Sequence, residues 1–320
     1  MKFGFLYKCF PPPKFLKLPH IGISFSDDNI KAIFFDKTST PPYLKSVIVP
    51  IEKGAIVSGS IVNTEEVVKK LSSIKETFNL EVVFFTIPDE LIYVFSASVP
   101  VGLNSNITES VAFIMEENVP LPLSDIIFDF VPTKIVQSES EFKASVVVTA
   151  CAKKEVEKFI DTLRKAGFSP IGCIHESQAV ADAVIPQKST EAFCIVHAKE
   201  KRIGIYLVKN NLVHFSTLRS IMEGDYKKQF LDEYVKFSEY YSKYDTGQNQ
   251  PIKSVFVCGE FEYAKEAVEA IVDSPDTLKD VTLSNVWANV FEINKFLPSI
   301  PYEESLNLSG PIGAVLSDIN

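Results

Sequence analysis

Residues 20–51 read HIGISFSDDNIKAIFFDKTSTPPYLKSVIVPI and contain three apolar runs separated by short polar breaks. The runs are Gly22–Phe25, Ile30–Phe35 and Tyr43–Ile51, and the first break is Ser26–Asn29. β-branched and aromatic residues between turn-forming residues are typical of strands. This stretch therefore predicts a three-stranded antiparallel meander.

A helix and a buried strand are predicted after this meander. Apolar residues repeat with helical spacing from Thr64, the expected N-cap, to Asn79. Val82–Thr86 is apolar throughout, which predicts a central parallel strand buried on both faces. A second meander at 192–220 is followed by a helix at 226–244 and a strand at 254–258. The chain thus carries two similar halves, and three strands, a helix and a strand form the repeating unit of the actin-like, ribonuclease H-like α/β fold.

The pattern between residues 89 and 169 predicts a small α+β module inserted in the first lobe. Its expected strands are Leu91–Val99, Ile126–Val131 and Phe142–Ala150, and its expected helices are Thr108–Asn118 and Lys153–Ala166. The predicted division is an N-terminal arm at 1–19, a first lobe at 20–88 and 170–187, the module at 89–169, a second lobe at 188–301, and a C-terminal segment at 302–320 that packs back on the first lobe.

Composition excludes several classes of protein. The 320 residues are 46% hydrophobic and 23% charged, which is typical of a globular protein of about two domains. Net charge is −9 and the only arginines are Arg164, Arg202 and Arg219, so a nucleic-acid partner is not expected. The five cysteines include no CxxC pair, which indicates neither a zinc site nor a disulfide framework. Four of them lie in apolar runs and are expected to be buried thiols: Cys151, Cys173, Cys194 and Cys258.

The first 19 residues differ in charge from the rest of the chain. They contain four lysines interleaved with large apolar residues, and no acidic residue precedes Asp27. A basic aromatic segment of this kind is suited to an anionic membrane surface. The expected contact residues are Lys2, Phe3, Phe5, Lys8 and Phe10. An arm packed along the first lobe is the alternative.

Residues 109–130 read ESVAFIMEENVPLPLSDIIFDF, and they are followed by the strand 146–150, a helix ending in Ala166-Gly167 and the segment 173–183. This succession of motifs resembles the PilM-type actin-like proteins of type IV pilus assembly (the FtsA/PilM family). The order of these motifs carries the resemblance. The matching residues are Pro120, Pro122, Leu123, Asp129, Ala166, Gly167, Glu176 and Ala179.

The resemblance implies a cytoplasmic adaptor at the inner face of the plasma membrane. PilM-like proteins dock the short cytoplasmic tail of a PilN-like single-span protein and so join the assembly platform that serves the pilus assembly ATPase. The expected partner site is a groove between the module and the first lobe, around the helix Glu109–Asn118 and the proline-stiffened turn that follows it. The apolar groups of this turn would be exposed, and its residues are Val119, Pro120, Leu121, Pro122 and Leu123. The alternative is that these residues fill the core of the module.

Many PilM-like proteins also bind ATP with magnesium, but the expected phosphate-binding turns are altered here. The family's first turn, Gly-Ile-Asp-Ile-Gly-Ser-Ser-Ser-Ile-Lys, aligns with residues 22–31, where the Asp is Ser24, the second Gly is Ser26 and two serines are aspartates. A carboxylate about 5 Å from a phosphate charge costs roughly 3 kcal/mol at an effective dielectric of 20.

The other two turns are altered as well. The second turn, expected as Val-Asp-Ile-Gly, is Val196-His197-Ala198-Lys199, and the third keeps Gly259 but continues with Glu260. The candidate nucleotide-binding residues are Gly22, Ser24, Ser26, Lys31, His197, Lys199 and Gly259. We therefore expect a degenerate nucleotide site, no catalytic residues and no bound metal. The alternatives are an active ATP-binding actin-like ATPase and an FtsA-like filament-forming adaptor of cell division.

Overall fold

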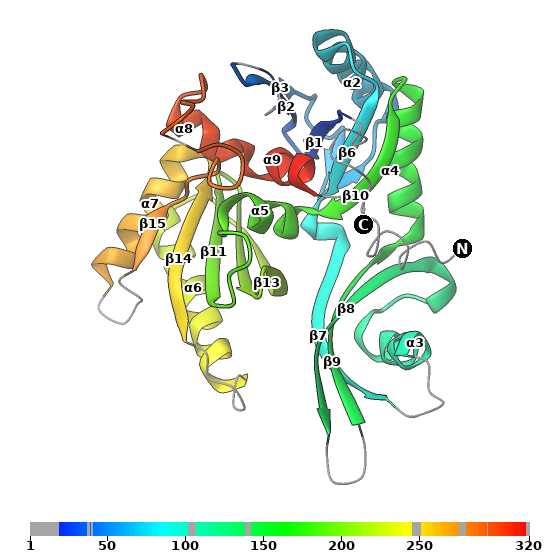
Figure 1. Cartoon of the computed structure of the whole chain (residues 1–320), viewed down its shortest axis with the longest axis vertical. Helices are drawn as coiled ribbons and strands as arrows, with labels where there is room; N and C mark the ends of the chain where they lie inside the picture. Colours follow the sequence, from blue (N-terminus) through cyan, green and yellow to red (C-terminus); the bar gives the residue numbers. More distant parts are fainter. Residues whose placement is uncertain are drawn as a thin grey trace.

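The computed structural model describes residues 19–36, 39, 41–101, 107–137, 142–244, 251–274, 280–292 and 294–317. Figure 1 shows two lobes beside each other, with a small module below the first lobe. The predicted basic arm lies outside the described residues except for Pro19, so its membrane contact stays a prediction. No helix in the described ranges is long and apolar enough to cross a membrane.

The first lobe is built on a five-stranded sheet with the order β3-β2-β1-β6-β10. Its strands are β1 (Ile21–Phe25), β2 (Asn29–Asp36), β3 (Tyr43–Pro50), β6 (Val82–Ile87) and β10 (Ser169–His175). The meander β1–β2–β3 is antiparallel, and β6 pairs parallel with both β1 and β10. A short hairpin of β4 (Ile56–Val57) and β5 (Ser60–Ile61) leads into α2 (Thr64–Phe78). Asn63, and not Thr64, is the N-cap of α2, because its side chain accepts from the Glu66 N–H.

The second lobe repeats this sheet. Its strands are β11 (Ala192–Lys199), β12 (Arg202–Lys209), β13 (Leu212–Ser220), β14 (Ile252–Gly259) and β15 (Val281–Leu283), in the order β13-β12-β11-β14-β15. The pairing directions match those of the first lobe. Helices α6 (Tyr226–Tyr244) and α7 (Phe261–Asp273) cover one face of the sheet. The prediction of two similar actin-like halves is confirmed.

The inserted module is an antiparallel sheet with one helix on one face. It contains β7 (Ile92–Val101), α3 (Ile107–Asn118), β8 (Ile126–Gln137) and β9 (Phe142–Ala152), in the sheet order β7-β9-β8. Short 3₁₀ turns, η2 (Asp89–Leu91) and η3 (Leu123–Asp125), precede β7 and β8. The module also touches the second lobe, since Ser96 Oγ of β7 lies 3.3 Å from His214 Nδ1 of β13.

Helix α4 (Lys153–Lys165) corrects the predicted boundary of the module. The sequence placed this helix in the module, but its buried side chains lie in the core of the first lobe beside α2. The Phe159 ring packs edge-on against Phe25 of β1, with 4.9 Å between the ring centroids. The apolar face of α4 thus packs against the sheet of the first lobe, and the module ends near Ala152.

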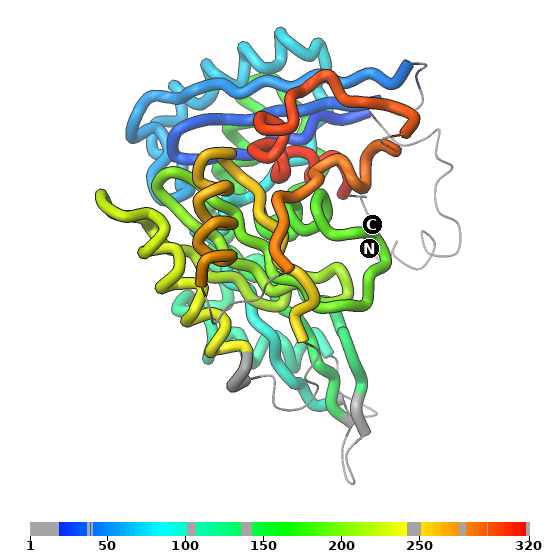
Figure 2. Tube along the Cα trace, turned by 90° about the vertical axis from the view of Figure 1, so that its left-hand side faces the viewer, coloured from blue at the N-terminus to red at the C-terminus, as the bar shows by residue number. Residues whose placement is uncertain are grey.

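One hydrophobic core joins the two lobes. It contains α5 (Glu176–Val184) and α9 (Ser309–Leu316), which follows α8 (Tyr302–Ser305) and η4 (Leu306–Leu308). Ile33 of the first sheet and Ile195 of the second belong to the same core. Figure 2 shows the red C-terminal helix against the blue N-terminal strands. The end of the chain therefore completes the first lobe and the seam between the lobes.

Two glycines let these elements approach at backbone distance. A Cβ on Gly313 of α9 would lie 1.7 Å from the Ala179 carbonyl oxygen of α5. A Cβ on Gly22 of β1 would lie 2.1 Å from the Pro311 carbonyl oxygen. Neither position has room for a side chain, so close packing with α9 explains Gly22 without any role in phosphate binding.

We expect Gly313→Ala to lower the free energy of unfolding by about 2–3 kcal/mol or more, because its Cβ would collide with backbone that cannot rotate away. The matched control is Gly310→Ala in the same helix, where the nearest atom to the new Cβ would be Ser24 Cβ at 3.4 Å. This control should be neutral or stabilising by up to about 1 kcal/mol. Urea denaturation of both variants measures the difference, and equal stabilities would contradict the backbone contact.

Candidate functional site

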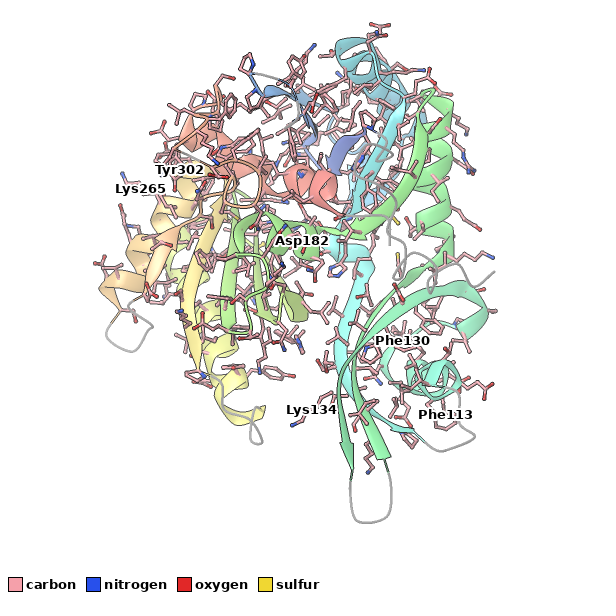
Figure 3. All side chains as sticks on the ribbon, viewed as in Figure 1. Phe113, Phe130, Lys134, Asp182, Lys265 and Tyr302 are labelled. Atoms are coloured by element: carbon pink, nitrogen blue, oxygen red, sulfur yellow. The ribbon has the colours of Figure 1, made fainter. Side chains whose placement is uncertain are left out.

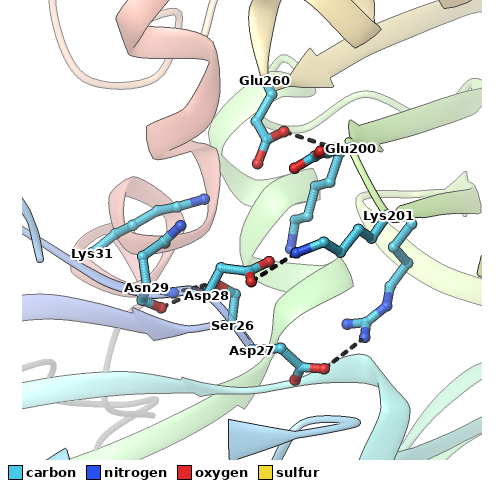
Figure 4. Close-up of a pocket in the computed structure, with 10 residues that line it drawn as sticks. Ser26, Asp27, Asp28, Asn29, Lys31, Glu200, Lys201 and Glu260 are labelled. Atoms are coloured by element: carbon cyan, nitrogen blue, oxygen red, sulfur yellow. Dashed lines mark hydrogen bonds and ion pairs between the residues drawn. The ribbon is translucent and has the colours of Figure 1, made fainter. Parts of the chain in front are cut away.

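Two hairpin turns face each other across the cleft between the lobes, as Figure 4 shows. The first connects β1 to β2 and is closed by Ser26, whose hydroxyl donates to the Asn29 carbonyl at 3.0 Å and accepts from the Asn29 N–H at 3.1 Å. The second connects β11 to β12 and carries Glu200 and Lys201. These are the turns at which the sequence placed the altered phosphate-binding motifs.

Ion pairs join the two turns directly. Asp28 lies 2.9 Å from Lys201 Nζ, and Asp27 lies 3.5 Å from an Arg202 guanidinium nitrogen. Arg202 also pairs with Glu90, which follows β6. Asp27 accepts from the backbone N–H groups of Ser58 and Gly59, at 3.0 Å each. The two aspartates that replace serines of the family motif therefore pair with basic side chains of the second lobe, and Asp27 also accepts from the backbone of the β4–β5 turn.

The remaining space between the turns is small. The cavity bounded by Ser26, Asp28, Lys199 and Arg202 has a volume of about 50 Å³. Pockets for small ligands usually measure about 300–1,000 Å³. No group of three His, Cys, Asp or Glu residues suited to a metal ion occurs among the described residues. The residues present do not fit a magnesium nucleotide in this arrangement, because Asp27 and Asp28 line the space between the turns and ion pairs span it.

The third turn has a structural role. Gly259 has a φ of +113°, and a Cβ there would lie 2.0 Å from the Ala198 carbonyl oxygen. Glu260, next in the chain, accepts from the Glu200 N–H at 2.9 Å. Gly259 is thus required by the close approach of β14 to β11, and Glu260 ties the third turn to the second.

Beneath the turns lies a buried ion pair between the lobes. Lys199 Nζ is 2.8 Å from Glu176 Oε1 at the start of α5, and the two side chains are only 12% and 7% exposed. Burial is the largest effect on the pKa of Lys199 and lowers it, but the charge and hydrogen bond of Glu176, together with the charges of Asp89 and Glu260, raise the pKa of this lysine overall. Burial and the charge of Lys199 together lower the pKa of Lys31 to about 8. An enclosed lysine therefore anchors the second turn.

Asp89 and His197 complete this buried polar cluster. Asp89 accepts from both the N–H and the hydroxyl of Ser177, at 2.9 Å each. Burial, and then the neighbouring Glu176 carboxylate, raise the pKa of Asp89 to about 6. Burial, with the charges of Lys199 and Lys31, lowers the pKa of His197 well below its ordinary value. Sequence reasoning missed Asp89, although its place just after a buried parallel strand was an available signal.

A second, larger cavity lies between the module and the rest of the molecule. Its volume is about 430 Å³. It is lined by residues 127–131 of β8, by Val147, Thr149 and Cys151 of β9, and by residues of β10, α5 and β13. We call this cavity the module groove. Cys173 of β10 lines it and is exposed, contrary to the expectation of a buried thiol.

The turn predicted as the partner site lies on the other face of the module sheet. Val119 is buried in the module core with Met115 of α3, and Leu121 packs partly against that core. Only Leu123 is an exposed large apolar residue of this turn. Phe130 and Phe113 lie on the same side, where α3 covers the sheet (Figure 3). The prediction that Val119 is exposed is wrong, and the alternative that it fills the core of the module holds for this residue.

The repeated sheets and the shared core define an actin-like two-lobe protein. The sequence pattern of the family described as type IV pilus assembly protein PilM matches residues 22–220, and the chain belongs to this family. No curated protein matches the sequence.

Solved structures show the same fold at low sequence identity. The PilM–PilN type IV pilus biogenesis complex matches with a TM-score of 0.70 and 16% identity, over 93% of this chain and 96% of that one. The cytoplasmic domain of EpsL, an inner-membrane component of the type II secretion system of Vibrio cholerae, matches with a TM-score of 0.52 and 10% identity, over 95% and 97% of the chains. The ethanolamine utilization protein EutJ from Carboxydothermus hydrogenoformans matches with a TM-score of 0.53 and 12% identity, over 96% of this chain and 90% of that one.

The raised pKa of Asp89 predicts how stability depends on pH. The folded protein binds this proton more tightly than the unfolded chain, whose aspartate pKa is near 3.8. The contribution of this group to the free energy of unfolding is fully present below about pH 4 and is lost as the pH rises through about 6.

We therefore expect Asp89→Asn, which keeps an acceptor for Ser177, to raise the free energy of unfolding by about 1–3 kcal/mol at pH 8. The gain should disappear at pH 4, and Asp232→Asn on the exposed side of α6 should have no effect at either pH. Urea denaturation at the two pH values tests this, and a less stable Asp89→Asn at pH 8 would contradict it.

Proposed function

We propose that this chain is a cytoplasmic adaptor of the type IV pilus inner-membrane platform and that it binds the short cytoplasmic tail of a PilN-like membrane protein. Membership of the PilM family supports this role, as does the fold likeness to a PilM–PilN complex. The observation that carries the proposal is the module groove, the larger of the two cavities and the one with apolar walls.

The dimensions of the module groove suit an extended peptide. Its volume of about 430 Å³ is in the range of ligand pockets. Five consecutive residues of β8 line it, which corresponds to about 13 Å of strand at roughly 3.3 Å per residue. Within the described module sheet, β8 pairs only with β9 and is an edge strand. A peptide there has both a strand edge and side-chain pockets to bind.

We also propose that the protein works without ATP hydrolysis. The support is the set of ion pairs between the two turns, together with the small cavity that they leave. A nucleotide would have to separate Asp28 from Lys201 and then place its phosphates beside both aspartates. The family's nucleotide site has, in this proposal, become a contact between the lobes.

The proposed location is the inner face of the plasma membrane. A PilN-like partner would hold the adaptor there, and the basic aromatic arm would add contact with anionic lipids. Two weak attachments together give stable membrane association where one does not.

A matched pair of variants tests whether the partner binds in the module groove or on the 120–123 turn. Ile127 of β8 lines the module groove and is 44% exposed, while Leu123 lies outside the groove lining and is 37% exposed. We expect Ile127→Gln to weaken binding of a fluorescent tail peptide by about tenfold, because it places a polar amide in an apolar pocket. Leu123→Gln should bind like the wild type.

Fluorescence polarisation measures both affinities, and thermal melting confirms that both variants are folded. The reverse order, in which Leu123→Gln alone loses binding, would place the partner on the turn. Absence of binding by the wild-type protein would reject the PilN-like tail as the ligand.

Calorimetry with magnesium and ATP should show no binding at micromolar nucleotide, because ion pairs and carboxylates occupy the space between the two turns. The same protein sample should bind the tail peptide, which controls for correct folding. A micromolar or tighter constant for ATP would contradict the proposal and restore the ATPase alternative.

A further inference from the structure

Among the described residues that line the module groove, Asp129 is the one acidic residue, and there is no lysine or arginine. Its neighbours on the same face of β8 are Ile127 and Val131, since side chains alternate along a strand. The facing walls include Val147, Cys151 and Ile174. His175 also lines the groove, but burial lowers its pKa to about 4, so it is neutral at physiological pH.

The carboxylate of Asp129 has no cationic partner in the described part of the chain. Among the described residues, it accepts a hydrogen bond only from the N–H of the next residue, Phe130, at 2.8 Å to Oδ1. The acids of the cleft differ in this respect, because Asp27, Asp28 and Glu176 are each paired with a lysine or arginine. The charge of the groove is therefore not compensated from within the described structure.

An unpaired carboxylate restricts which peptide is able to cover it. A wholly apolar segment would remove water from Asp129 and leave its charge unsatisfied, which weakens binding. A lysine or arginine at that point would instead form a charge-assisted hydrogen bond. Because Ile127 and Val131 lie two residues away on either side, an extended partner would place apolar side chains two positions before and after its basic residue.

We propose that Asp129 selects a partner segment that carries one basic residue, with apolar residues two positions away on each side. This inference rests on the proposed binding of a PilN-like tail in the module groove. It adds the chemistry of the occupant, which the fold likeness does not specify.

The test is a double-mutant cycle between the protein and the peptide. The probes are a synthetic copy of the cytoplasmic tail of the PilN-like protein from the same cell and a second copy with its basic residue replaced by glutamine. Asp129→Asn is the protein variant, and its Oδ1 keeps the bond from the Phe130 N–H. Asp125→Asn is the matched control, because Asp125 is exposed in the same module but does not line the groove.

We expect Asp129→Asn to weaken binding of the native tail by about three- to tenfold, with Asp125→Asn unchanged. The glutamine peptide should bind the wild type with a similar loss and should show no further loss with Asp129→Asn. Raising sodium chloride from 50 to 500 mM should weaken only the binding of the native tail to the wild-type protein, because this is the one combination in which both charges are present.

Failure of the inference and failure of the proposed function give different results. If the wild type does not bind the tail, the proposed function is wrong. If the tail binds in an Ile127-dependent manner but Asp129→Asn changes neither affinity nor salt dependence, the groove is the site and the selection of a basic residue is wrong. A tail that lacks lysine and arginine and still binds in the groove would also overturn the inference.

Discussion

The backbone contact of the C-terminal helix with β1 and α5 determines how the two lobes are arranged. Gly22 and Gly313 lack side chains at the points where α9 touches the strand and the helix, and a Cβ at either point would overlap a carbonyl oxygen. Because α9 fits this closely, Ile33 of the first sheet and Ile195 of the second share one core. That shared core brings the β1–β2 and β11–β12 turns within ion-pair distance of each other.

The charges in the cleft follow from this arrangement. Exposed pairs such as Asp28–Lys201 each contribute about 0–1 kcal/mol, so they do not hold the lobes together by themselves. The enclosed Lys199–Glu176 pair is different, because removal of one partner would leave a buried charge unpaired, at a cost of about 3–5 kcal/mol. The perturbed pKa values of Lys31 and Asp89 show that this region keeps polar groups in an environment that opposes their charge.

The inserted module separates its structural and its proposed binding role between two faces of one sheet. Alternate residues of β9, such as Val146 and Val148, pack under α3 and form the module core. The residues between them, such as Val147 and Thr149, line the module groove. The proposed partner would bind on the face that α3 does not cover, where Asp129 is the one carboxylate among the described residues that line the groove.

The two similar halves and the order of their strands along the chain could be predicted from the sequence, because apolar runs and turn residues are local signals. The alteration of the three turns followed from their comparison with the family motif. The folded structure was needed to show that Val119 is buried, that α4 belongs to the first lobe and that Gly22 and Gly259 serve close packing. It also decided that Asp89 lies beside Glu176 and that the groove opens on the face opposite the 120–123 turn. Each of these depends on contacts between residues far apart in the chain, and a local pattern of hydrophobic and polar residues carries no information on which surface will cover it.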